Sequence, residues 1–375
     1  MNSRLSRLVV LATLAAASGC GSSQPAPGPP PTTVTQSPSA SAAQPAGVDA
    51  SAEPPAATTP PATANVKPAP PTAPQPATGL RDLAGRYLES DGTGGWRTNE
   101  RAALELEKLG PEAAAGLLPL LADRQVEVRR GAAFYLLGSF NPNEPELVKA
   151  FSALLDDADR TIRGIGLSAA RQMRREDQTA AVPRLAAMLD PAREEKPANR
   201  ESVARLLGGL KTDAAGALES LVAAATSDPA TQVRSASLIA IAQIADTQAA
   251  PLVAKGLTDE DAAVRLVAAV RLRQLGAGSA PASKELAAAL ADSDSRVRAA
   301  AAEALVKIGK PAVAEIAAQL AQNSLDGRKL ALYCLNKIGP DAKDAAPQVE
   351  KCLADSDADV QKLAAAALAS INSKP

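Results

Sequence analysis

Arginine and aspartate recur in this sequence at a fixed spacing, and these are the residues whose types could do chemistry. Seven arginines occupy the same place in a recurring segment: Arg129, Arg163, Arg200, Arg234, Arg265, Arg298 and Arg328. Aspartates stand six residues before that place: Asp123, Asp157, Asp228, Asp259, Asp292 and Asp355, with Glu194 and Gln322 in the other two copies. A carboxylate beside a guanidinium group could transfer a proton or hold a phosphate group.

The repetition of these pairs favours a structural role over a catalytic one. A catalytic site needs one constellation, whereas this one recurs along most of the chain. We therefore predict a ladder, in which each aspartate caps or ties a turn. Each arginine then bonds a turn carboxylate in its own or the adjacent copy.

The composition limits the other chemistry that is open to the chain. Its 375 residues include no histidine and only 3 cysteines, so Ser-His-Asp triads, Cys-His pairs and histidine metal sites are excluded. The 40 basic and 41 acidic residues leave no positive surplus for binding nucleic acid. The sequence thus predicts a protein that is not an enzyme, with no cofactor, no metal site and no nucleic-acid partner.

The ladder residues belong to a segment that repeats about every 33 residues. DSDSRVRAAAAEALVKIG (292–309) is matched by DEDAAVRLVAAVRLRQLG (259–276) and by DSDADVQKLAAAALASIN (355–372). Equivalent positions, taken from the valine before the arginine, are Thr98, Val128, Ile162, Asn199, Val233, Val264, Val297, Gly327 and Val360. A period of this length is typical of a solenoid.

Each copy predicts two helices. Small or apolar residues at offsets 0, 4, 5, 7, 8 and 11 from the reference position fall on one face of a helix. A shorter helix precedes it, and glycines at Gly110, Gly276, Gly309 and Gly339 mark helix ends. No strand-like alternation is seen, so residues 80–375 are predicted to form an all-α solenoid of about nine helix pairs.

The motif D-x-x-x-x-V-R-x-x-A-A-x-A-L-x-x-I-G resembles the HEAT repeat, in the bacterial HEAT-like type that phycobilin lyases also contain. The resemblance extends over nearly all of residues 80–375. It implies a binding scaffold whose second helices line the concave side, with offsets 2, 6 and 9 as the surface that varies between copies.

Two groups of residues on that surface are candidates for partner binding. The first is a basic and aromatic group near the C-terminus: Lys329, Tyr333, Asn336, Lys337 and Lys362. It suits an acidic partner surface or, alternatively, is a solvated face. The second is an apolar run, Ile239, Leu266 and Val270, which is either a partner site or buried by bending of the array.

The N-terminus is predicted to be a targeting segment. Arg4 and Arg7 precede an apolar run, and the following ASGC resembles a bacterial lipobox, with residues 1–19 as signal peptide and Cys20 as the lipidated residue. Residues 20–79 then form a Pro/Ala-rich linker without the apolar surface needed to fold. The resemblance implies a lipid-anchored protein of the bacterial envelope, at the outer membrane where there are two.

These features together predict a membrane-anchored scaffold that binds another envelope protein through the concave face of the solenoid. An envelope enzyme or ligand carrier that uses a concave pocket remains the alternative.

Irregular features of the array carry further expectations. The tryptophan Trp96 is expected to cover the open end of the first copy. The longer turn DPAREEKPAN (190–199) is either a binding protrusion or a neutral loop. Cys334 and Cys352 form either a disulfide or two buried thiols.

Overall fold

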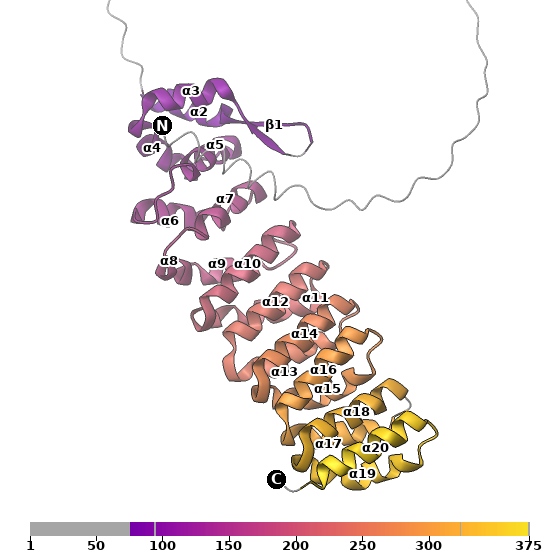
Figure 1. The fold of residues 1–375 in the computed structure, drawn as a ribbon. Coiled ribbons are helices and arrows are strands. Elements are labelled where there is room, and N and C mark those ends of the chain that lie inside the picture. Colours follow the sequence, from indigo (N-terminus) through magenta and orange to yellow (C-terminus); the bar gives the residue numbers. More distant parts are fainter. Residues whose placement is uncertain (1–75, 94, 323, 374–375) are drawn as a thin grey trace, which may run out of the picture.

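The computed structural model of the chain describes residues 76–93, 95–322 and 324–373. The predicted signal peptide, Cys20 and nearly all of the predicted linker lie outside the described residues. The described part is an elongated array of short helices, which follow one another in chain order from one end to the other (Figure 1).

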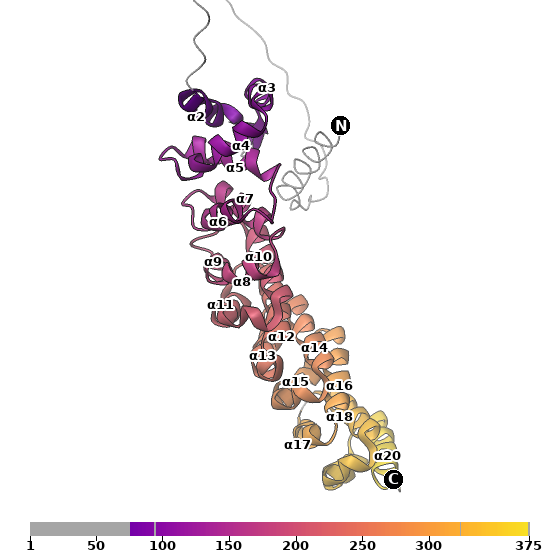
Figure 2. The same cartoon turned by 90° about the vertical axis from the view of Figure 1, so that its left-hand side faces the viewer.

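Two rows of helices run along the array. The longer helices form one row, here called the second-helix column: α2 (Pro76–Tyr87), α5 (Val126–Leu137), α7 (Arg160–Ala170), α10 (Pro197–Leu210), α12 (Thr231–Ile244), α14 (Ala262–Leu275), α16 (Ser295–Ile308), α18 (Leu325–Ile338) and α20 (Ala358–Ile371). The shorter first helices are α4 (Pro111–Leu117), α6 (Pro145–Leu154), α8 (Arg175–Ala180), α9 (Val182–Ala187), α11 (Leu218–Ser227), α13 (Ala249–Ala254), α15 (Ser283–Ala288), α17 (Val313–Ala318) and α19 (Ala346–Lys351). Figure 2 shows α10 to α20 of the column on one side of the array and α9 to α17 of the first helices on the other.

Short 3-10 helices connect many of these elements: η1 (Leu118–Ala122), η2 (Lys211–Ala217), η3 (Asp246–Gln248), η4 (Lys255–Thr258), η5 (Gly276–Ala282), η6 (Ala289–Ala291), η7 (Lys310–Ala312), η8 (Gln319–Ala321), η9 (Gly339–Ala345) and η10 (Cys352–Ala354). They tighten the chain where a first helix begins or ends.

Helix α16 shows why the repeated segment folds as predicted. The side chain of Asp294 accepts a hydrogen bond from the backbone of Arg296 and so caps the helix. Val297 and Leu305 on the predicted face are completely buried. Gly309 ends the helix with φ of 74°, which favours glycine. The prediction of an all-α solenoid is therefore confirmed.

The first copy differs from the sequence prediction. The segment that contains Thr98 does not begin a second helix; β2 (Trp96–Thr98) pairs antiparallel with β1 (Leu88–Ser90), and α3 (Glu100–Leu109) follows. The prediction that strands are absent was therefore wrong. The hairpin forms because the Asp91 carboxylate accepts hydrogen bonds from the backbone of Thr93 and Gly95 and thereby closes the turn.

Helix α2 takes the place in the column that was assigned to the residues after Thr98. It packs against α5, with Gly131 lying against the backbone of Ala84 so closely that no side chain would fit there. The hairpin and α3 are thus an insertion between α2, which begins the second-helix column, and the rest of the array.

Candidate functional site

The recurring arginines lie at the turns between first and second helices, where each joins two copies. Arg265 is representative: its Nε and Nη2 donate to the two carboxylate oxygens of Asp292 in the next copy, at 2.8 and 3.0 Å. Its Nη1 donates to the carbonyl of Asp259 in its own copy, at 2.9 Å. The Asp259 carboxylate also accepts from the backbone of Asp261, which fixes the turn. One guanidinium group therefore ties a turn to its neighbour.

The same kind of ion pair joins each copy to the next: Arg81 to Asp123, Arg129 to Asp157, Arg163 to Glu194, Arg200 to Asp228, Arg234 to Asp259, Arg265 to Asp292, Arg298 to Asp326 and Arg328 to Asp355. We call this series the turn ladder and each pair a rung. The sequence left open whether each arginine bonds a carboxylate in its own copy or in the adjacent one. In the structure the carboxylate always belongs to the adjacent copy. The bond that an arginine makes within its own copy is to a backbone carbonyl.

The rungs differ in burial. The side chains of Arg200 and Asp228 are 2% and 0% exposed, and their atoms are joined at 2.7 and 2.8 Å. Gln322 cannot provide a carboxylate, so Arg298 pairs instead with Asp326, which is 61% exposed. The most deeply buried part of the ladder is therefore at the centre of the array.

The electrostatics of the rung between Arg265 and Asp292 oppose acid–base chemistry. Hydrogen bonding to Asp292 raises the pKa of Arg265. Burial acts to raise the pKa of Asp292, but the hydrogen bonds from Arg265 and from the backbone of Asp294 outweigh it, and the net shift is downward. Both partners are held in their charged forms, whereas a general acid or base needs a pKa near the working pH.

Arg81 is a rung residue that the sequence analysis missed. Its Nε and Nη2 donate to Asp123 at 2.8 and 3.0 Å, from helix α2. The signal was present in the sequence, because LRDLAG (80–85) follows the V-R-x-x-A-A pattern. The hairpin and α3 separate Leu80, the reference position of this copy, from Val128 of the next copy by 48 residues (128 − 80), which is longer than the period of about 33 residues in the rest of the array.

The ladder ends in the last copy, where Gln361 stands in place of arginine. Its Nε2 donates to the carbonyl of Asp355 at 2.7 Å, as the arginines do in their own copies. A neutral amide satisfies the turn without leaving a charge that needs a carboxylate in a further copy.

The basic group near the C-terminus is only partly as predicted. Lys329 is not a free charge, because its Nζ lies 3.1 Å from carboxylate oxygens of both Asp357 and Asp359. Asp357 and Asp359 stand just before Val360, the reference position of the ninth copy, and not at offsets 2, 6 and 9, where the sequence placed the variable surface. The hydrogen bonds to Asp359 and Asp357 raise the pKa of Lys329.

The remaining members of that group are available to a partner. Tyr333 is 42% exposed, and the Nζ of Lys337 lies 5.7 Å from the centre of its ring. Lys337 and Lys362 are exposed, while Asn336 is half-buried and its carbonyl accepts a hydrogen bond from Ser370.

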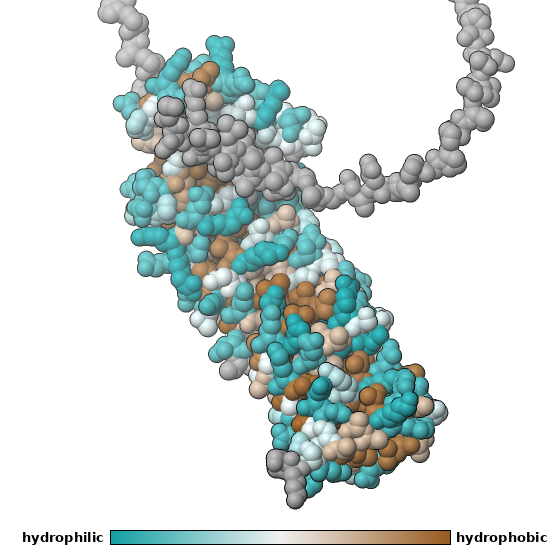
Figure 3. Space-filling view, in the orientation of Figure 1, coloured by the Kyte–Doolittle hydropathy of each residue, from teal (hydrophilic) through white to brown (hydrophobic). Residues whose placement is uncertain are grey.

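The apolar run is only partly exposed. Ile239, Leu266 and Val270 are all half-buried, and Leu266 and Val270 pack against the apolar core. Figure 3 shows apolar surface on this side of the array only in separate areas among polar side chains. Of the two alternatives, burial therefore accounts for Leu266 and Val270.

Trp96 lies on a second helix rather than over the open end of the array. The centre of its ring is 4.0 Å from the guanidinium carbon of Arg130 on α5. Arg130 is buried and also bonds Asp159 at 2.7 Å. The tryptophan therefore covers a buried cation, and the expectation of an end cap was wrong.

The longer turn of the fourth copy folds back onto the third copy and does not protrude. Arg193 bonds the carboxylate of Asp156 and the carbonyl of Leu155. Glu195 pairs with Arg160 at 3.0 Å. The turn therefore helps to join the third and fourth copies. The two alternatives from the sequence, a binding protrusion and a neutral loop, did not include this role.

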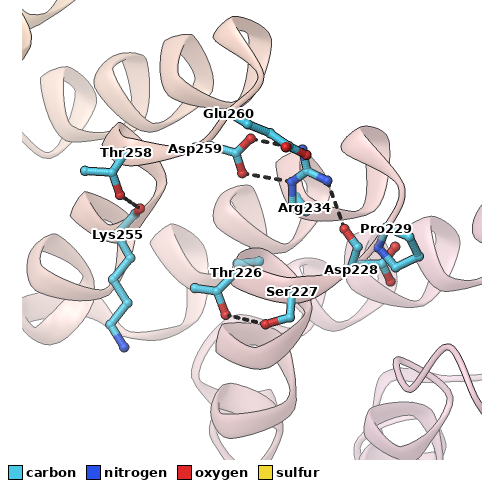
Figure 4. Close-up of a pocket in the computed structure, with 10 residues that line it drawn as sticks. Thr226, Ser227, Asp228, Pro229, Arg234, Lys255, Thr258, Asp259 and Glu260 are labelled. Atoms are coloured by element: carbon cyan, nitrogen blue, oxygen red, sulfur yellow. Dashed lines mark hydrogen bonds and ion pairs between the residues drawn. The ribbon is translucent and has the colours of Figure 1, made fainter.

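A surface pocket of about 640 Å³ lies beside the rung between the fifth and sixth copies. Figure 4 shows Arg234 reaching from one side toward Asp259 and Glu260, with the Asp228 carbonyl bonded to the same guanidinium group. Lys255 points away from them. The charged groups at the centre of the pocket are thus already bonded to one another as part of the ladder.

The two cysteines of the array are free thiols in the structure. Cys334 on α18 is fully buried, and burial raises the pKa of its thiol to about 12. Cys352 is also buried, in η10.

Among the described residues, no three or more histidine, cysteine, aspartate or glutamate side chains are grouped so that they could hold a metal ion. None of the helices described is both long and apolar enough to cross a membrane.

Comparison with known proteins identifies the repeat. Two family models match: HEAT repeats over residues 218–284, and a HEAT repeat over residues 284–311. No match was found among curated proteins.

Several solved structures are similar to the array. An engineered protein is 22% identical, covers 78% of this chain and 84% of its own, and has a TM-score of 0.41. Importin beta is 14% identical over 78% of this chain and 46% of its own, with a TM-score of 0.44. YibA of E. coli is 18% identical over 74% of this chain and 98% of its own, with a TM-score of 0.36.

The matched segment extends from α11 into the turn after α16, and the same rungs continue on both sides of it. Residues 218–311 therefore match HEAT repeats, and the described residues as a whole form an all-α solenoid of the HEAT/armadillo type, a fold that is generally used for binding other proteins.

Proposed function

We propose that this protein is a lipid-anchored interaction module of the bacterial cell envelope that binds another protein through the second-helix column. Supporting this, the ladder residues are bonded between copies and so contribute to the array. The variable residues of the column are left to differ from copy to copy.

One observation carries the proposed binding site: Tyr333 is exposed on α18 beside the ammonium group of Lys337. A tyrosine offers a large contact area at small entropic cost and is enriched among the residues that dominate binding. With Lys329 already paired, the charges available to an acidic partner are Lys337 and Lys362.

Site-specific photo-crosslinking in intact cells tests this site. A photoreactive residue at Tyr333 should capture a discrete partner, whereas one at exposed Lys284 on α15, in the row of first helices, should not. Once the partner is purified, Tyr333→Ala should weaken its binding by about 2 kcal/mol. Capture from Lys284 but not from Tyr333 would place the binding surface on the other side of the array.

The anchor rests on the sequence alone. ASGC with Cys20 follows a charged and then an apolar segment, and two acyl chains suffice for stable membrane attachment. Cys20→Ser should therefore move the protein from the membrane fraction to a soluble or unprocessed form. Unchanged processing and membrane association would contradict the anchor, with no bearing on the binding site.

A further inference from the structure

Aromatic side chains gather at the end of the array that holds α2 and α5 (Figure 1). The chain has 1 tryptophan, 3 tyrosines and 3 phenylalanines, and four of these seven rings come together around α5: Tyr87, Trp96, Phe134 and Tyr135. The ring centre of Tyr87 lies 6.3 Å from that of Phe134 and 5.6 Å from that of Tyr135. Trp96 reaches α5 from the hairpin and lies over Arg130, one turn before Phe134. We call these four residues the aromatic patch.

Part of the aromatic patch faces solvent. Tyr87 and Tyr135 are buried, whereas Trp96 is 37% exposed and Phe134 is half-buried. The two arginines at the patch each have a carboxylate partner, because Arg130 bonds Asp159 at 2.7 Å and Arg97 bonds Glu89 at 3.4 Å. The patch therefore offers ring surface beside charges that are already paired, which suits a ligand with little charge of its own.

A segment of matching chemistry precedes the array in the sequence. KPAPPTAPQ (67–75), which lies outside the described residues, has Pro68, Pro71 and Pro74 at intervals of three residues and carries one charge, on Lys67. A polyproline II helix has three residues per turn, so these prolines would form a single ridge in that conformation. Proline-rich segments bind to surfaces lined with aromatic side chains, because a preformed polyproline II helix loses little entropy on binding.

The segment is long enough to reach the patch. It is joined directly to α2, whose 12 residues from Pro76 to Tyr87 span about 18 Å. Residues 68–75 span about 25 Å as a polyproline II helix, which is sufficient to run back along α2 to Tyr87. Because the segment is covalently attached beside its site, its effective concentration there is on the order of millimolar, and a weak contact is enough to hold it.

We infer that residues 67–75 fold back along α2 and bind the aromatic patch as a polyproline II helix, with Pro68 and Pro71 against Trp96 and Phe134. This contact fixes the linker at the point where it meets the array. It lies at the opposite end of the array from Tyr333, so it does not depend on the proposed binding site for a partner protein.

The fluorescence of Trp96 tests the contact, because this is the only tryptophan of the chain. Quenching by acrylamide in the full chain measures how far the ring is open to solvent. Changing Pro68, Pro71 and Pro74 together to glycine should raise the quenching constant about twofold, since glycine does not favour the polyproline II conformation. The matched control changes Pro25, Pro27 and Pro30 of the same linker to glycine and should leave quenching as it is in the unaltered chain.

A synthetic peptide of residues 67–75 gives a second measurement. Added at millimolar concentration to the variant with glycine at 68, 71 and 74, it should restore the quenching constant of the unaltered chain. The same peptide with glycine at its three proline positions should not. Equal quenching of Trp96 in the variant and in the control would overturn the contact. If the peptide nevertheless protected Trp96 in both, the patch would belong to a proline-rich segment of another chain instead.

Discussion

The fourth and fifth copies differ from the sixth to eighth copies both in sequence and in the burial of their rungs. The central copies depart from the repeat pattern, with Glu194 for aspartate, Lys211 for glycine and Ser237 for alanine. Their rung between Arg200 and Asp228 is nevertheless almost completely buried.

Among the later copies, Gln322 replaces the aspartate of the eighth copy, and the rung between Arg298 and Asp326 is the one whose carboxylate faces solvent most. How closely a copy follows the repeat pattern therefore does not tell how deeply its rung is buried. The cost of breaking a rung depends on that burial, because a buried charge that loses its partner is left without a carboxylate and without water.

Breaking the central rung should have the largest effect. Asp228→Ala leaves the guanidinium group of Arg200 buried without a carboxylate, and should lower the free energy of unfolding by about 3–5 kcal/mol. The midpoint of urea denaturation measures the change. The double variant Asp228→Leu with Arg200→Met removes both charges and should recover much of the loss, and no recovery would show that the buried charge is not the cause.

Lys211 should be the next most informative position. It ends α10 with φ of 54° and ψ of −136°, nearly the angles of Gly110, and a side chain is strained there. Lys211→Gly should raise the free energy of unfolding by about 1–2 kcal/mol. Gly276→Lys, at the equivalent place in a regular copy, should lower it by a similar amount. Opposite signs in the two variants are required; equal signs would contradict the strain.

Ser237 should have a smaller effect. It occupies an alanine position on α12, is fully buried, and its hydroxyl has no hydrogen-bond partner. Ser237→Ala removes that unsatisfied group and should stabilise the array by about 1 kcal/mol in thermal or urea unfolding. Half-buried Ser235 on the same helix is the control, and its change to alanine should be nearly neutral. A destabilised Ser237→Ala would mean that the hydroxyl is satisfied.

The exposed rung should show the smallest effect. Asp326→Ala removes the partner of Arg298 and should change the free energy of unfolding by less than about 1 kcal/mol, because the Asp326 carboxylate is mostly exposed to water and Arg298 keeps its bond to the carbonyl of Asp292. Together with Asp228→Ala it compares two rungs of the same chemistry at different burial. Equal losses in urea unfolding would break the relation between burial and contribution.

The sequence predicted that a ladder of bonds exists, but it did not predict which residues are bonded to one another. The recurrence of Arg265 and its equivalents indicated a structural bond, and the structure adds that the carboxylate partner lies in the next copy. Sequence could not find Arg298 with Asp326, because Gln322 removes the expected partner and a side chain from another offset replaces it. Sequence also did not predict the ion pairs of Lys329 with Asp357 and Asp359, which stand just before the reference position of the next copy.

By itself the sequence determined the fold class, the period and the buried face of each helix, as Val297 and Leu305 show. These depend on spacing along a single helix, which the chain fixes locally. Tertiary structure alone decided that a hairpin follows α2, that Trp96 covers Arg130, and that Arg298 bonds Asp326. Each of these depends on which surfaces meet between elements distant in the chain, and the free energy of such contacts comes from packing and burial that no local pattern records.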